Sequence, residues 1–165
     1  MPSRRSQISM TPEEVDAFLR RPGQVMNIAT IGADGRPHLV AMWYGFLDAK
    51  PAFHTFNKSQ KIVNLRRDPR ITCLVEAGDT YGELCGVELI GTGTLVEDVD
   101  RVVELSRTIS PRYPSLGPVT QAEAGAPDER AVVEALRRTL AKRVAVVVEV
   151  ERVVSWDHAK LVGRY

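Results

Sequence analysis

The stretch "FHTFNKSQKIVNLRRDPR", residues 53–70, contains a short apolar strand followed by a helical pattern. Ile62 and Leu65 are spaced to face inward, so Lys58 and Lys61 fall in or just before the first turn of the helix. The N-terminal end of a helix carries a partial positive charge, which favours carboxylates and disfavours lysines. Two lysines at this end therefore indicate a negatively charged group that the sequence itself does not supply.

The sequence around this stretch predicts a mainly β chain with a few helices at its periphery (α+β). Apolar and alternating runs predict strands over residues 24–31, 38–47, 52–56, 70–77, 83–97 and 143–156. Besides the helix that ends at Pro69, periodicity predicts helices over 11–19, 98–109 and 128–142. Thr11, Pro12 and Glu14 form the start of the first helix, with a capping box.

Turn residues indicate how these strands connect. The Asp34-Gly35 pair favours a tight hairpin between the first two strands. Three glycines mark bulges or barrel corners in the fifth strand: Gly86, Gly91 and Gly93. Meandering strands with glycine corners favour a small antiparallel barrel, and the sequence predicts one domain over residues 1–165.

Composition limits the function classes. The chain has 165 residues, 44% of them hydrophobic, and a net charge of +1, so we expect no nucleic-acid partner and no membrane surface as a partner. The opening "MPSRRSQISM" lacks the apolar run of a signal peptide, which predicts a cytoplasmic protein. Cys73 and Cys85 match no metal or redox spacing, as expected for free thiols in a reducing compartment.

The residue pattern contains no recognisable catalytic or metal centre. The three histidines, His38, His54 and His158, lie in different predicted elements without ligand spacing, so we expect no metal site. The "GTGT" segment at 91–94 lacks the third glycine of a dinucleotide fingerprint. No acid, base or nucleophile is identified as catalytic.

The opening stretch, which includes "KSQKIVNLRRDPR" at 58–70, is accompanied by two further motifs: "ATIGADGRPHLVAMWY" at 29–44 and "SWDH" at 155–158. Together, over nearly the whole chain, they resemble the pyridoxamine 5'-phosphate oxidase-like proteins, which have an FMN-binding-like split β-barrel fold. The resemblance is greatest to the actinobacterial branch that uses the deazaflavin coenzyme F420.

The resemblance implies where a cofactor lies. It assigns the cofactor phosphate to Lys58, Ser59, Lys61 and Asn64, and it places the tricyclic ring against the strand that contains Val40, Ala41, Met42 and Trp43. The resemblance also implies a homodimer, in which Trp156, Asp157 and Lys160 close the partner's site. The alternative for the lysines is a solvated surface, and for Trp156 it is a packed terminal strand.

The same resemblance implies an oxidoreductase that transfers a hydride from reduced coenzyme F420 to a small unsaturated organic substrate. FMN is the alternative cofactor, although Gln60 stands where flavin-using relatives often carry a basic residue. A non-enzymatic module that binds a flavin, a deazaflavin or haem is the alternative from another class. Tyr44 or water would supply the proton, and the loop over residues 110–127 is predicted to border the substrate.

Overall fold

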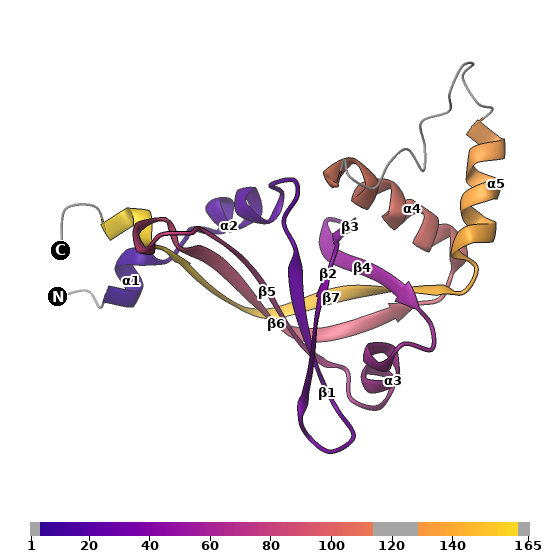
Figure 1. Ribbon diagram of the computed structural model, residues 1–165, viewed down its shortest axis with the longest axis horizontal. Helices are drawn as coiled ribbons and strands as arrows, with labels where there is room; N and C mark the ends of the chain where they lie inside the picture. The colour runs from indigo at the N-terminus through magenta and orange to yellow at the C-terminus, as the bar shows by residue number, and fades with distance from the viewer. Residues whose placement is uncertain (1–3, 114–128, 162–165) are drawn as a thin grey trace.

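The computed structural model describes residues 4–113 and 129–161, and these residues form a seven-stranded antiparallel sheet that curls into a split barrel (Figure 1). The strands lie in the order β2-β1-β5-β6-β7-β4-β3. Their bounds are Met26–Ile31 for β1, Pro37–Met42 for β2, Gly45–Leu47 for β3, Lys50–Phe56 for β4, Arg70–Ala77 for β5, Cys85–Val96 for β6 and Arg143–Asp157 for β7. The predicted mainly β, split-barrel fold is confirmed.

Helices lie at the two ends and on the outside of this sheet (Figure 1). Their bounds are Arg4–Ile8 for α1, Pro12–Leu19 for α2, Gln60–Arg67 for α3, Val99–Ile109 for α4 and Glu129–Leu140 for α5. Short 3₁₀ turns cover Tyr81–Glu83, Ser110–Arg112 and His158–Leu161. The α4 and α5 helices pack together at one end of the sheet, whereas α1 lies beside the last turn at the opposite end.

The strand β7 separates two hydrophobic cores. Val144, Val146 and Val148 point into the barrel interior, where they meet Phe53 of β4. Ala145 and Val147 point to the other face of the sheet, which α4 and α5 cover. A strand covered on both faces has an almost unbroken apolar sequence, which explains the run of apolar residues at the start of β7.

The predicted strand over 38–47 is wrong as a single element. The β2 strand ends at Met42, and β3 begins at Gly45 on the opposite edge of the sheet. Tyr44 lies between them, fully buried, and its hydroxyl donates to the carbonyl of Leu19 at 2.6 Å. The chain therefore leaves β2 to bury Tyr44, and the two edges of the split barrel are joined by two residues.

The glycines of β6 have three different roles. The register between β6 and β7 shifts between Ile90 and Gly91, which confirms a bulge at that position. Gly86 instead lies under the indole of Trp156, and Gly93 lies against Leu65. Only one of the three predicted corners is therefore an irregularity in strand pairing.

Arg112 and Tyr113 attach the end of α4 to the barrel. The Arg112 guanidinium donates to the carbonyls of Leu19 and Arg21 at 2.8 and 3.0 Å, at the C-terminal end of α2. The Tyr113 hydroxyl donates to the carbonyl of Gln24 at 2.6 Å. These residues begin the predicted substrate-bordering loop, and here they have a structural role; residues 114–127 of that loop lie outside the described residues.

Candidate functional site

A buried polar cluster lies where β4 leads into α3. Lys61, the second residue of α3, is only 9% exposed, and its Nζ donates to Thr55 Oγ1 at 3.3 Å. The Thr55 hydroxyl in turn contacts Ser59 Oγ at 3.4 Å. Ser59 is the N-cap residue of α3, but its side chain makes no capping bond. We refer to Thr55, Ser59 and Lys61 as the α3 cluster.

The α3 cluster contains a positive charge without a counter-charge. Burial lowers the pKa of Lys61 from its ordinary value. No carboxylate within residues 4–113 or 129–161 forms an ion pair with it. The first backbone N–H groups of α3 add further donors at the same end of the helix. The cluster therefore has donors suited to an anion, and Thr55 is a member that the sequence analysis did not single out.

The other two predicted phosphate residues lie differently. Lys58 is exposed in the turn before Ser59 and forms no hydrogen bond or ion pair with the part of the chain that the structure describes. Asn64 is fully buried, but its amide already donates to Thr30 Oγ1 at 3.0 Å and accepts from Gln60 at 2.9 Å. The structure thus brings Ser59 and Lys61 together, whereas Asn64 joins α3 to β1.

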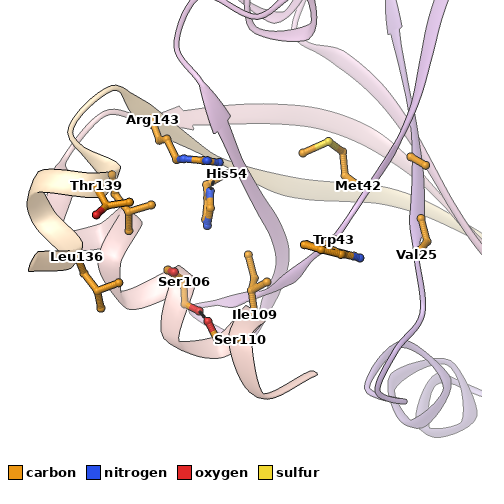
Figure 2. Close-up of a pocket in the computed structure, with 12 residues that line it drawn as sticks. Val25, Met42, Trp43, His54, Ser106, Ile109, Ser110, Leu136, Thr139 and Arg143 are labelled. Carbon is orange, nitrogen blue, oxygen red and sulfur yellow. Dashed lines mark hydrogen bonds between the residues drawn. The ribbon is translucent and has the colours of Figure 1, made fainter. Parts of the chain in front are cut away.

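A cavity of about 450 Å³ opens beside the end of β2, where β2 faces β4, β7 and the ends of α4 and α5 (Figure 2). Ala41, Met42 and Trp43 form one wall of this cavity, and the ends of α4 and α5 form another. The side chains of His54 and Arg143 complete it from β4 and β7. Three of the four residues predicted to flank a cofactor ring therefore line a cavity, and we call this space the seam cavity.

The remaining predicted ring residue and the tail lie elsewhere. Val40 is half-buried and packs against the barrel core. Trp156 is half-buried over Gly86, its cross-strand partner in β6. Lys160 donates to the carbonyl of Ser9 at 2.9 Å and pairs with Glu14 of its own chain. That Trp156, Asp157 and Lys160 contribute to a partner's site stays a prediction.

The structure argues against Tyr44 as a proton donor. Its side chain is fully buried, its hydroxyl is bonded to the Leu19 carbonyl, and burial raises its pKa to about 12. Trp43, the neighbouring residue, faces the seam cavity instead and stacks on Tyr113 with 5.3 Å between ring centroids.

His54 and Arg143 carry the titratable groups that line the seam cavity. Arg143 Nη1 lies 3.4 Å from His54 Nδ1. A guanidinium can only donate, so Nδ1 accepts and the ring proton sits on Nε2. Burial, with a further contribution from the Arg143 charge, lowers the pKa of His54 to about 4. His54 is therefore neutral near pH 7.

This pKa predicts a pH dependence of stability. An unfolded histidine titrates near pH 6.5, so between pH 6.5 and 4 the unfolded chain binds a proton that the folded chain does not. The free energy of unfolding therefore falls as the pH falls through this window. From pH 8 to pH 5 the contribution of His54 is a loss of about 2 kcal/mol.

Urea denaturation at several pH values, on the wild type and on His54→Gln, measures this contribution as the difference between the two curves. His158→Gln, which changes a histidine of the last turn, is the matched control and should follow the wild type. Parallel curves for the wild type and His54→Gln would contradict the assignment.

Two kinds of feature are absent from the described part of the chain. No group of three or more His, Cys, Asp or Glu side chains suited to a metal ion occurs there. No helix among residues 4–113 and 129–161 has both the length and the apolar character needed to cross a membrane. Cys73 and Cys85 are both free thiols, and burial raises the pKa of Cys73 to about 12.

Comparisons with known proteins agree with this architecture. The protein family described as "Pyridoxamine 5'-phosphate oxidase" matches residues 11–157. A conserved hypothetical protein from Mycobacterium tuberculosis is 36% identical, with a TM-score of 0.81 over 97% of this chain and 92% of its own. No match was found among curated proteins.

More distant solved structures share the fold. An F420 reductase is 22% identical, with a TM-score of 0.58 over 87% of this chain and 98% of its own. HutZ, the haem storage protein from Vibrio cholerae, is 13% identical, with a TM-score of 0.60 over 90% of this chain and 97% of its own. At these identities the likeness shows a common architecture.

Proposed function

Because the chain belongs to the pyridoxamine 5'-phosphate oxidase family, we propose that it is an oxidoreductase that binds coenzyme F420 and reduces a small unsaturated organic molecule. The coarser statement, a fold and family associated with flavin-type cofactors and oxidoreductases, follows from the family itself. The choice of cofactor and substrate rests on the α3 cluster and the seam cavity.

The observation that carries the proposal is the buried ammonium of Lys61. A buried cation without an acidic partner is costly for a folded protein unless a ligand supplies the opposite charge. A cofactor phosphate would accept from the Lys61 ammonium, the Ser59 hydroxyl and the free N–H groups of α3. The residues present therefore fit the phosphate of a flavin or a deazaflavin.

The seam cavity supplies the second part of the proposal. Ala41, Met42 and Trp43 offer an apolar wall at the edge of β2 for a tricyclic ring. When bound, reduced F420 would supply the hydride, so the protein needs no nucleophile of its own. The tasks of this chain are to bind the cofactor, to exclude water and to orient the substrate.

The choice of F420 over FMN rests on Gln60. Gln60 lies between Ser59 and Lys61, so the helix start carries one positive charge fewer than it would with a basic residue there. The F420 reductase has this fold, so the proposal requires no change of architecture.

Absorption titration of the purified protein tests the proposal. Adding F420 should shift the deazaflavin band with saturation, whereas adding FMN should give a weaker response. Turnover is then measured as the loss of reduced F420 in the presence of unsaturated substrates. Saturable binding without turnover would favour the non-enzymatic alternative, and a sharp haem band with no response to F420 would contradict the proposal.

We also propose that the protein is a homodimer. Several large apolar side chains of the described residues are exposed, among them Leu39 at 66% and Val153 at 44%. Exposed apolar groups along a sheet are typical of a surface that another chain covers. The second half of β7, which contains Val150 and Val153, is a candidate for this surface.

Light scattering on the purified protein should give a molar mass twice that of one chain. Val153→Glu should lower the measured mass toward that of the monomer, because the dimer interface would bury the new carboxylate. Ala131→Glu adds the same charge on the exposed side of α5 and is the control. A wild type that is monomeric at micromolar concentration would contradict the dimer. Deletion of the residues after Ser155 is a less informative test. It would also remove the Trp156 indole that packs on Gly86 within the same chain.

A further inference from the structure

The seam cavity contains a second cation without an acidic partner. Arg143 Nε is buried and has no hydrogen-bond partner. The guanidinium lies over the ring of Phe56, 4.6 Å from its centroid, and contacts His54. No carboxylate of residues 4–113 or 129–161 pairs with it. The contacts of Arg143 hold its position but leave its charge uncompensated.

The polar groups beside Arg143 are arranged as donors. Figure 2 shows Arg143 directly beside the His54 ring, within the cavity that α4, α5 and β2 enclose. The accepting nitrogen of His54 faces Arg143, so its Nε2–H remains free to donate. No Asp or Glu is among the residues that line the cavity. The polar wall therefore offers a positive charge and N–H groups.

The other walls of the seam cavity are largely apolar. Trp43 and Met42 lie on the β2 side, and the α4 and α5 side contributes Ile109, Leu136 and Leu140. Ser106, Ser110 and Thr139 also line that side, where the hydroxyls of Ser110 and Thr139 donate to backbone carbonyls four residues earlier in the chain. A volume of about 450 Å³ is in the usual range for small-molecule sites. The matching ligand has an apolar body and a single anionic end.

Arg143 is separate from the α3 cluster. Successive side chains of a strand point to opposite faces, so His54 and Thr55 of β4 lie on different sides of the sheet. Thr55 contacts Lys61 on one face, and His54 contacts Arg143 on the other. One strand therefore presents two anion-binding positions, one on each face.

We propose that the seam cavity binds a small organic carboxylate, with its anionic end on Arg143 and His54 and its apolar body against Ile109 and Leu136, so that the Trp43 wall stays available to the cofactor ring. Resting on the proposed function, this names the substrate class as unsaturated monocarboxylates. A guanidinium matches the planar carboxylate with two parallel hydrogen bonds. The single cation of this wall suits one negative charge.

Calorimetric titration with cinnamate and its neutral analogue cinnamamide tests the inference on the full-length protein, with and without F420. The two probes have the same apolar body and differ in charge. Wild type should bind cinnamate at least about tenfold more tightly than cinnamamide. Arg143→Gln should abolish that preference, and Arg138→Gln, which removes an exposed arginine of α5, should keep it.

Equal binding of the two probes by the wild type, or no binding of cinnamate, would overturn the inference without any variant. A preference that survives in Arg143→Gln, with a melting temperature showing that this variant is folded, would also overturn it. Loss of F420 binding in Arg143→Gln would assign Arg143 to the cofactor instead. If the wild type binds neither F420 nor FMN but binds cinnamate through Arg143, the proposed function fails and the carboxylate site stands.

Discussion

Lys61→Met should weaken cofactor binding roughly 10- to 100-fold, because a hydrogen bond to a charged group contributes about 1.5–3 kcal/mol. The same change should leave the free protein as stable as the wild type or more stable. The ammonium of Lys61 is buried without an acidic partner, and methionine fills a similar volume without a charge. If Lys61→Met binds the cofactor more weakly and is at least as stable as the wild type, Lys61 serves ligand binding and not the stability of the fold.

Absorption titration gives the affinities, and thermal melting of the free protein gives the stabilities. Lys58→Met should weaken binding less and in a salt-dependent manner, because Lys58 is exposed. Lys50→Met removes an equal charge at the far end of β4 and is the control. Unchanged affinity in Lys61→Met would show that the α3 cluster does not hold the cofactor.

Gly91→Ala should lower the free energy of unfolding by about 3 kcal/mol or more, equivalent to a fall of roughly 10 °C in the melting temperature. A Cβ at Gly91 would lie 2.0 Å from the carbonyl oxygen of Glu149 and 3.1 Å from the amide nitrogen of Glu151. Both are backbone atoms of β7, so no side-chain rotation can relieve the contact. The bulge between β6 and β7 would have to open.

Gly82→Ala is the matched control, since a Cβ there would meet nothing within 4 Å. Its stability should stay within about 0.5 kcal/mol of the wild type. Urea denaturation of both variants at one pH gives the comparison. A Gly91→Ala protein as stable as Gly82→Ala would mean that the bulge can move at little cost.

The predictable part of the fold is the part that local patterns determine. The capping box of Thr11 and Glu14 appears as expected, because a cap depends on residues only three positions apart. The strand over 143–156 was also predictable, because its apolar run is a local pattern. The break between β2 and β3 was not predictable in this way, because Tyr44 leaves the strand to contact Leu19 and Tyr113, which are distant in sequence.

The site was predictable to a similar extent. Lysines at the wrong end of a helix dipole indicated Lys61, since that argument needs only the start of the helix. The pairing of His54 with Arg143 joins residues 89 positions apart, and nothing in either neighbourhood points to the other. Asn64 lies in α3 as predicted, but its amide donates to Thr30 of strand β1 and accepts from Gln60, and the contact with Thr30 joins residues 34 positions apart.

The place of β4 in the sheet has a consequence for how the chain folds. The sheet neighbours of β4 are β3 and β7, and β7 begins only at Arg143. During synthesis the β3–β4 hairpin therefore has no sheet to join until most of the chain has left the ribosome. Strand pairing between distant segments forms slowly, because the chain loses conformational entropy in bringing the segments together before their contacts can stabilise it. The wall that brings His54 to Arg143 thus forms in the last docking step, and a nascent chain stopped before β7 would lack the seam cavity.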